Sequence, residues 1–233
     1  MVQVSLIEIG KKYNLDVVCK TECTYAQYER HLSSLRNEKL CILELGVYTG
    51  ASLAVWEEYF PNATIVGLDI NGLDRKYGDR VHFVKGSQSN TDLLTEISEK
   101  FAPHGWDIII DDASHVASLT KVSFDHLFIN HLKAGGLYFI EDWGTGYWDD
   151  WVDGMEFIRT DQDHDTERVK SDGTPAPSRF PSHDYGMVGL IKQLVDEAGM
   201  DSIKKRSTDQ AIRPTRINYM EVNFAFAMVK KIG

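Results

Sequence analysis

Five short apolar runs, most of which end in polar or acidic residues, constrain the fold of this chain more than any other feature of its sequence. They occupy residues 40–45, 64–69, 81–86, 107–112 and 136–142. Segments with the apolar period of an α-helix separate several of them, for example from Leu93 to Phe101. Such alternation is typical of a mainly parallel β-sheet flanked by helices. The sequence therefore predicts an α/β fold.

The two ends of the chain depart from this alternation. Apolar side chains between Tyr25 and Leu35 stand at helical spacing, so we expect residues 1–38 to form a small helical cap in front of a main domain, 39–233. Near the carboxyl end, SIKKRS (202–207) and EVNFAFAMVKK (221–231) are suited to pair as antiparallel strands. The predicted fold class is a Rossmann-like, mostly parallel sheet with an antiparallel C-terminal edge and an N-terminal helical cap.

Two helices and one insertion complete the predicted organisation. Apolar residues between Leu119 and Ile129 indicate a helix that stops at Gly135 and Gly136, and a last helix is expected at about 186–198. Residues 149–184 are rich in charge and show little periodicity. Long irregular segments inside a compact domain are usually lids, binding loops or disordered insertions, so we expect a lid-like insertion there, with a solvated loop as the alternative.

The charge balance limits the classes of partner. The chain has 25 basic and 35 acidic side chains, a net charge of −10, and therefore no global basic field for nucleic acid or an anionic membrane surface. No apolar stretch approaches 18 residues. Three cysteines do not suggest the disulfide framework of a small secreted protein. We expect a cytoplasmic protein without nucleic-acid or membrane partners; homo-oligomerisation stays open.

The turn after the first run predicts a cofactor site. In open α/β sheets, ligands bind outside the carboxyl ends of the strands, and glycine permits close approach of a ligand to the backbone. Asp69, at the end of the second run, is placed to accept hydrogen bonds from ribose hydroxyls. An NAD-binding fingerprint fits less well, because Tyr48 and Ala51 stand where it needs glycines. The expected cofactor residues in this part of the chain are Glu44, Gly46, Tyr48, Gly50, Ser52 and Asp69.

The pattern ExGxxxG with a later strand-end acid is similar to motifs I and II of class I S-adenosylmethionine-dependent methyltransferases. The resemblance places the adenine pocket at residues 86–88, where Gln88 could hydrogen-bond the base edge. Asp111, at the end of the fourth run, is also expected at the cofactor site. S-adenosylmethionine is accordingly the expected cofactor.

Acidic residues gather at the ends of the fourth and fifth runs. Strands in a sheet lie about 4.8 Å apart, so Asp112, Glu141 and Asp142 are expected within coordination distance of one ion. Oxygen ligands favour a hard divalent cation such as Mg²⁺ over zinc. His115 can face the same cavity and act as a general base on a hydroxyl that the metal has acidified.

The motifs DDASH and EDWGTGYW resemble those of metal-dependent sugar O-methyltransferases that act on macrolides and rhamnosylated polyketides, and of the cephalosporin 7-alpha-methoxylation protein. The similarity runs over about residues 40–231. It implies an ion held by Asp112, Glu141 and Asp142, His115 as the base, and a small-molecule vicinal diol as acceptor. We hypothesise that the methyl group is transferred by in-line displacement. Four aromatic residues are candidates for the floor of the acceptor pocket: Trp143, Tyr147, Trp148 and Trp151.

Three alternatives stay open at this point. A catechol-type acceptor would chelate the ion equally well. An NAD-dependent oxidoreductase would bind NADH rather than S-adenosylhomocysteine. A noncatalytic binding module would keep the cofactor turn and tolerate loss of His115.

Overall fold

The computed structural model describes residues 4–13, 20–148, 150–155, 168–169, 173, 175–176, 183–204 and 214–233. In this part of the chain, seven strands form one sheet in the order β3-β2-β1-β4-β5-β9-β8. Strands β1 to β5 are parallel, whereas β9 is antiparallel to β5 and β8 to β9. The predicted mostly parallel sheet with an antiparallel C-terminal edge is thus confirmed. The strands are β1 (Cys41–Leu45), β2 (Thr64–Asp69), β3 (Val81–Lys85), β4 (Trp106–Asp111), β5 (Leu132–Glu141), β8 (Ile217–Val222) and β9 (Phe226–Lys231).

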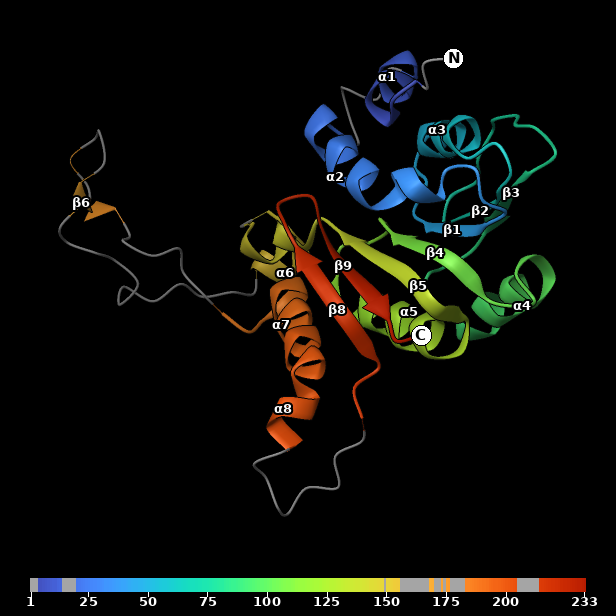
Figure 1. Cartoon of the computed structure of the whole chain (residues 1–233). Helices are drawn as coiled ribbons and strands as arrows, with labels where there is room; N and C mark the ends of the chain where they lie inside the picture. Colours follow the sequence, from blue (N-terminus) through green and yellow to red (C-terminus); the bar gives the residue numbers. More distant parts are fainter. Residues whose placement is uncertain are drawn as a thin grey trace.

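Helices cover both faces of the sheet (Figure 1). On one face lie α1 (Leu6–Lys12), α2 (Glu22–Leu32) and α3 (Ala51–Tyr59), and on the other lie α4 (Thr91–Phe101), α5 (Ala117–Asn130) and α7 (Gly186–Ala198). The remaining short elements are η2 (Ser33–Leu35), η3 (Trp143–Tyr147), α6 (Val152–Met155), α8 (Met200–Lys204) and the β6 (Arg168–Val169) and β7 (Pro175–Ala176) pair.

Helix α2 shows how the local sequence sets this packing. Thr21 caps its start, because the Thr21 side chain accepts a hydrogen bond from the backbone N–H of Thr24. Tyr25, Tyr28 and Leu32 recur at helical spacing and are fully buried against the sheet. The division of the chain at residue 38 remains a prediction.

Two details of the sequence-based prediction are wrong. Helix α5 ends at Asn130, and Gly135 and Gly136 lie inside β5 rather than in a helix-ending turn. The run at 202–207 does not begin a strand, because α8 continues the helical path beyond Gly199, whose backbone is helical. The partner of β9 is instead β8, Ile217–Val222.

Most of the predicted insertion 149–184 lies outside the described residues, so its role as a lid remains a prediction. Within the described ranges, no helix is long and apolar enough to cross a bilayer.

The strand order reverses at β1, which lies between β2 and β4. The register places Leu45 beside Asp111, and Asp111 beside Ile140 of β5. The carboxyl ends of β1, β4 and β5 therefore meet at one edge of the sheet, where ligands bind in open α/β folds.

Candidate active site

The turn after β1 brings two backbone segments close together. Gly46 has a φ of 81°, and a Cβ atom there would overlap the backbone of Asp112. Asp69 closes the turn, because its Oδ2 accepts hydrogen bonds from the N–H groups of Val47 (3.0 Å) and Tyr48 (2.9 Å). The carboxylate predicted to bind a ribose is thus engaged in holding the turn.

Glu44 and Ser52 lie beneath this turn. The Ser52 hydroxyl donates a hydrogen bond to Glu44 Oε2 at 2.8 Å, and Gly50, with a φ of 72°, begins α3 between them in the sequence. The Glu44 side chain is completely buried, and burial raises the pKa of Glu44 to about 7. Glu44 therefore belongs to the interior below the turn.

Gln88 and Asp111, both expected to contact the cofactor, bind each other. Gln88 Nε2 donates to Asp111 Oδ1 at 3.1 Å, and Gln88 Oε1 accepts from the Ser114 N–H at 3.0 Å. Asp111 also accepts hydrogen bonds from Ser123 Oγ (2.6 Å) and Tyr138 OH (3.0 Å). Burial raises the pKa of Asp111 to about 6. Both ends of the Gln88 amide are engaged inside the protein.

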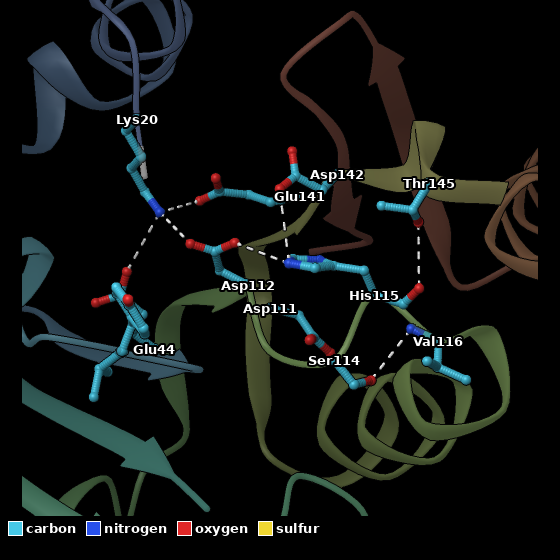
Figure 2. Close-up of polar contacts among 12 residues, drawn as sticks. Lys20, Glu44, Asp111, Asp112, Ser114, His115, Val116, Glu141, Asp142 and Thr145 are labelled. Atoms are coloured by element: carbon cyan, nitrogen blue, oxygen red, sulfur yellow. Dashed lines mark hydrogen bonds and ion pairs between the residues drawn. The ribbon is translucent and has the colours of Figure 1, made fainter. Parts of the chain in front are cut away.

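Lys20, just before α2, inserts its ammonium among three carboxylates (Figure 2). Lys20 Nζ lies 2.5 Å from Asp112 Oδ2, 2.8 Å from Glu141 Oε1 and 3.7 Å from Glu44 Oε1. The Lys20 side chain is 1% exposed. Burial lowers the pKa of Lys20, but the three carboxylates outweigh burial and hold that pKa well above its usual value. Lys20 therefore stays charged and neutralises part of the acidic cluster.

Glu141 points toward α2. Its Oε1 accepts a hydrogen bond from Tyr28 OH at 2.6 Å in addition to the Lys20 ion pair. Burial, reinforced by the charge of Asp112, raises the pKa of Glu141 to about 8, whereas Lys20 and Tyr28 act in the opposite direction.

Asp112 links this cluster to His115. His115 Nε2 lies 3.7 Å from Asp112 Oδ1 and 3.7 Å from Asp142 Oδ2, and one ligand atom of each of the three side chains lies within 4.8 Å of the others. Burial raises the pKa of Asp142, with His115 acting against it. Two of the three predicted metal ligands thus lie beside the predicted base, while the Glu141 carboxylate lies with Lys20 (Figure 2).

Three site residues adopt backbone conformations that favour glycine. Among the described residues other than glycine, positive φ occurs at Tyr48 (46°), His115 (50°) and Asp142 (50°). The carbonyl of His115 is held in place by hydrogen bonds from Thr145 Oγ1 (3.3 Å) and Trp151 Nε1 (3.1 Å). Such conformations persist where surrounding structure fixes them, and they concentrate at functional sites.

Two cavities adjoin at this edge of the sheet. One, of about 240 Å³, borders Lys20, His115 and Asp142; the other, of about 260 Å³, borders Asp69 and Gln88. Both cavities border the same four residues of the two turns: Gly46, Tyr48, Asp112 and Ala113.

The aromatic residues that were predicted to form the floor of the acceptor pocket lie in different environments. The ring of Trp151 lies 5.9 Å from that of His115, whereas Trp143 Nε1 donates to the carbonyl of Asn223. The Trp148 side chain is half exposed. Of these residues, Trp151 is the one in ring contact with the predicted base.

Sequence reasoning missed Lys20 and Tyr28. A single lysine before a helix carries no recognisable signal, and Tyr28 is visible only as part of an apolar helix face. The excess of carboxylates at Glu44, Asp112 and Glu141 does indicate that some cation must lie among them.

Comparison with known proteins places this geometry in context. No protein-family model matches the chain. It is 38% identical over 130 residues to the mycinamicin VI 2''-O-methyltransferase of Micromonospora griseorubida, covering 52% of this chain and 31% of the relative. It is 34% identical over 176 residues to the demethylmacrocin O-methyltransferase of Streptomyces fradiae, covering 72% of this chain and 38% of the relative.

A solved structure extends the similarity over the whole chain. The MycE methyltransferase from the mycinamycin biosynthetic pathway, in complex with Mg, SAH and mycinamycin VI, matches with a TM-score of 0.71 and 27% identity, covering 99% of this chain and 55% of that one. The chain thus spans 31% and 38% of the two curated relatives and 55% of MycE. The chain is also 39% identical over 130 residues to the 8-demethyl-8-(2-methoxy-alpha-L-rhamnosyl)-tetracenomycin-C 3'-O-methyltransferase of Streptomyces olivaceus, covering 52% of this chain and 32% of the relative. These matches confirm the resemblance carried by the motifs: the chain is similar in sequence and fold to macrolide and sugar O-methyltransferases.

Proposed function

We propose that this chain binds S-adenosylmethionine and a divalent cation and transfers a methyl group to a hydroxyl of a sugar that carries a vicinal diol. The observation that carries the proposal is the border between the two cavities at Gly46 and Asp112, with Asp69 on one side and His115 and Asp142 on the other. A ligand across this border would extend from the cavity beside Asp69 and Gln88 to the one lined by His115 and Asp142. The substrates named for the relatives, and the groups bound to MycE, support these ligands.

The turn at Gly46 suits the methyl donor. Asp69 accepts three hydrogen bonds from backbone N–H groups, those of Val47, Tyr48 and Asn71. Because a carboxylate has about four acceptor sites, one stays available for a ribose hydroxyl. S-adenosylmethionine, when bound, supplies an electrophilic methyl group.

The acidic side chains fit a hard divalent cation. Asp112, Glu141 and Asp142 would hold it through carboxylate oxygens, which suits Mg²⁺. Together with Glu44, these acids outnumber Lys20, so the cluster can take up more positive charge. A divalent cation, when bound, lowers the pKa of a hydroxyl and can orient two adjacent oxygens.

His115 is the proposed proton acceptor. Its Nε2 faces the space between Asp112 and Asp142, and its backbone is fixed by Thr145 and Trp151. A neutral imidazole has one ring nitrogen with a free lone pair, which can take a proton from an acidified hydroxyl. Hydrogen bonds to the His115 carbonyl hold the backbone from which the imidazole projects, which supports proton transfer from one defined hydroxyl.

The decisive experiment measures transfer of a labelled methyl group from S-adenosylmethionine to a panel of rhamnosylated and deoxysugar natural products, with catechols in parallel. We expect a mass shift on a diol-bearing sugar, its loss with EDTA, and recovery with Mg²⁺. His115→Ala should abolish transfer, whereas His104→Ala, at an exposed position near the start of β4, should not. Turnover that is insensitive to EDTA, or methylation confined to catechols, would contradict the proposal.

A further inference from the structure

Lys20 holds one carboxylate oxygen of each of two proposed metal ligands. Its Nζ lies 2.5 Å from Asp112 Oδ2 and 2.8 Å from Glu141 Oε1, and both acids are proposed metal ligands. A divalent ion on the same oxygens would lie beside a buried ammonium, where water provides little screening. Full ligation by both acids and the present position of Lys20 therefore oppose each other.

Glu44 offers the ammonium a second position. Glu44 Oε1 is buried, lies 3.7 Å from Lys20 Nζ, and has no hydrogen-bond partner among the described residues. A buried carboxylate oxygen that accepts no hydrogen bond is costly, so the Lys20 ammonium, already in ion-pair range of Glu44 Oε1, would be stabilised by moving to hydrogen-bond distance from it. Glu44 is not one of the proposed metal ligands.

The local backbone permits such a movement. Lys20 precedes Thr21, the N-cap of α2, and so lies outside the helix. Helix α2 is anchored separately, because Tyr28 OH binds Glu141 and the Tyr28 ring packs on Phe139 and Phe226. The flexible lysine stem can therefore change partner while α2 stays in place.

We propose that Lys20 is a two-position internal cation: it neutralises Asp112 and Glu141 when no metal is bound, and it shifts onto Glu44 when a divalent ion takes those oxygens. This inference rests on the metal site of the proposed function. Its consequence is that Lys20 weakens metal binding and Glu44 partly offsets that effect. The pair sets the affinity of the site for its ion.

A double-mutant cycle with Mn²⁺ as the probe tests this. Free Mn²⁺ is counted by electron paramagnetic resonance in the wild type, Lys20→Met, Glu44→Gln and the double variant. We expect Lys20→Met to bind Mn²⁺ about tenfold more tightly and Glu44→Gln about fivefold more weakly, within the range of coupled sites. In the Lys20→Met background, Glu44→Gln should weaken Mn²⁺ binding clearly less than it does in the wild type, because only the direct attraction between the Glu44 carboxylate and the ion is left.

Control variants distinguish a failure of this inference from a failure of the proposed metal site. Lys133→Met removes another lysine–carboxylate pair, with Asp107, and should leave Mn²⁺ affinity unchanged. Asp112→Asn should lose the ion. Should Lys20→Met fail to fold, Lys20→Gln removes the charge while keeping amide donors.

Equal or weaker Mn²⁺ binding by the charge-removing Lys20 variant would overturn the inference while leaving the metal site intact. A Glu44→Gln effect that is as large without Lys20 as with it would overturn the inference as well. Absence of Mn²⁺ binding in the wild type, or binding that survives Asp112→Asn, would overturn the proposed metal site and the inference together.

Discussion

The hydroxyl of Tyr28 gives a sharp test of how the N-terminal helices are attached to the sheet. Tyr28 OH donates to Glu141 Oε1 at 2.6 Å, and both side chains are buried. The Tyr28 ring packs among Trp56, Phe139 and Phe226, with centroids 4.7 to 5.3 Å away. Tyr28→Phe keeps this ring packing and removes one hydrogen bond to an acidic group.

The expected cost can be worked from the contact. A hydrogen bond contributes about 0.5–1.5 kcal/mol when its partner is neutral and about 1.5–3 kcal/mol when its partner is charged. Because the pKa of Glu141 is raised to about 8, the free energy of unfolding at pH 7 should fall by about 1 kcal/mol. Tyr59→Phe is the matched control: Tyr59 is equally buried in the same aromatic cluster, but its hydroxyl has no hydrogen-bond partner among the described residues. Its removal should change stability by less than about 0.5 kcal/mol.

Urea unfolding at pH 7 measures both variants. The midpoint should fall for Tyr28→Phe with an unchanged denaturant slope, and it should stay near the wild-type value for Tyr59→Phe. Equal losses in the two variants would show that the Tyr28 hydroxyl is no more important than an unpaired one, and would refute the assigned role of the Glu141 contact.

The same geometry predicts three more outcomes. The pKa of Glu44 rises from 4.5 to about 7, so the folded state binds more protons than the unfolded chain and loses stability as the pH rises through this window. Between pH 5 and pH 8, the free energy of unfolding of the Glu44→Gln variant should fall by up to about 3 kcal/mol less than that of the wild type, as measured by urea unfolding. Equal falls in the two proteins would contradict this. Gly46→Ala places a Cβ against the backbone of Asp112, so S-adenosylhomocysteine should no longer raise the melting temperature. If it still does, the turn at Gly46 is not part of the cofactor site. Asp142→Asn changes a half-exposed side chain, so it should weaken Mn²⁺ binding without lowering the melting temperature; unchanged affinity would remove Asp142 from the ligand set.

The sheet could be predicted because its central strands are buried on both faces and therefore read as continuous apolar runs. The buried face of helix α5 was harder to predict from the sequence. Leu119, Val122 and Ile129 are partly exposed, whereas the polar Thr120 and Ser123 are buried. Ser123 faces inward to hydrogen-bond the Asp111 carboxylate, so a polar residue occupies a position that periodicity assigns to an apolar one.

The sequence predicts those residues of the candidate site that directly follow the ends of strands. Asp112 and Asp142 follow neighbouring parallel strands, and His115 follows Asp112 closely enough to share their cavity. Lys20 reaches the same place from 92 residues earlier in the chain, which no local pattern indicates. Contacts of that separation depend on how α2 packs across the sheet.

The left-handed backbone at Tyr48, His115 and Asp142 has a consequence for protein engineering. Glycine adopts positive φ without steric cost, so glycine at these positions relieves local strain but deletes the side chains that border the cavity. A directed-evolution campaign that selects heat resistance alone would gain nothing from preserving these three side chains. Selection for turnover must therefore be applied in every round to retain them.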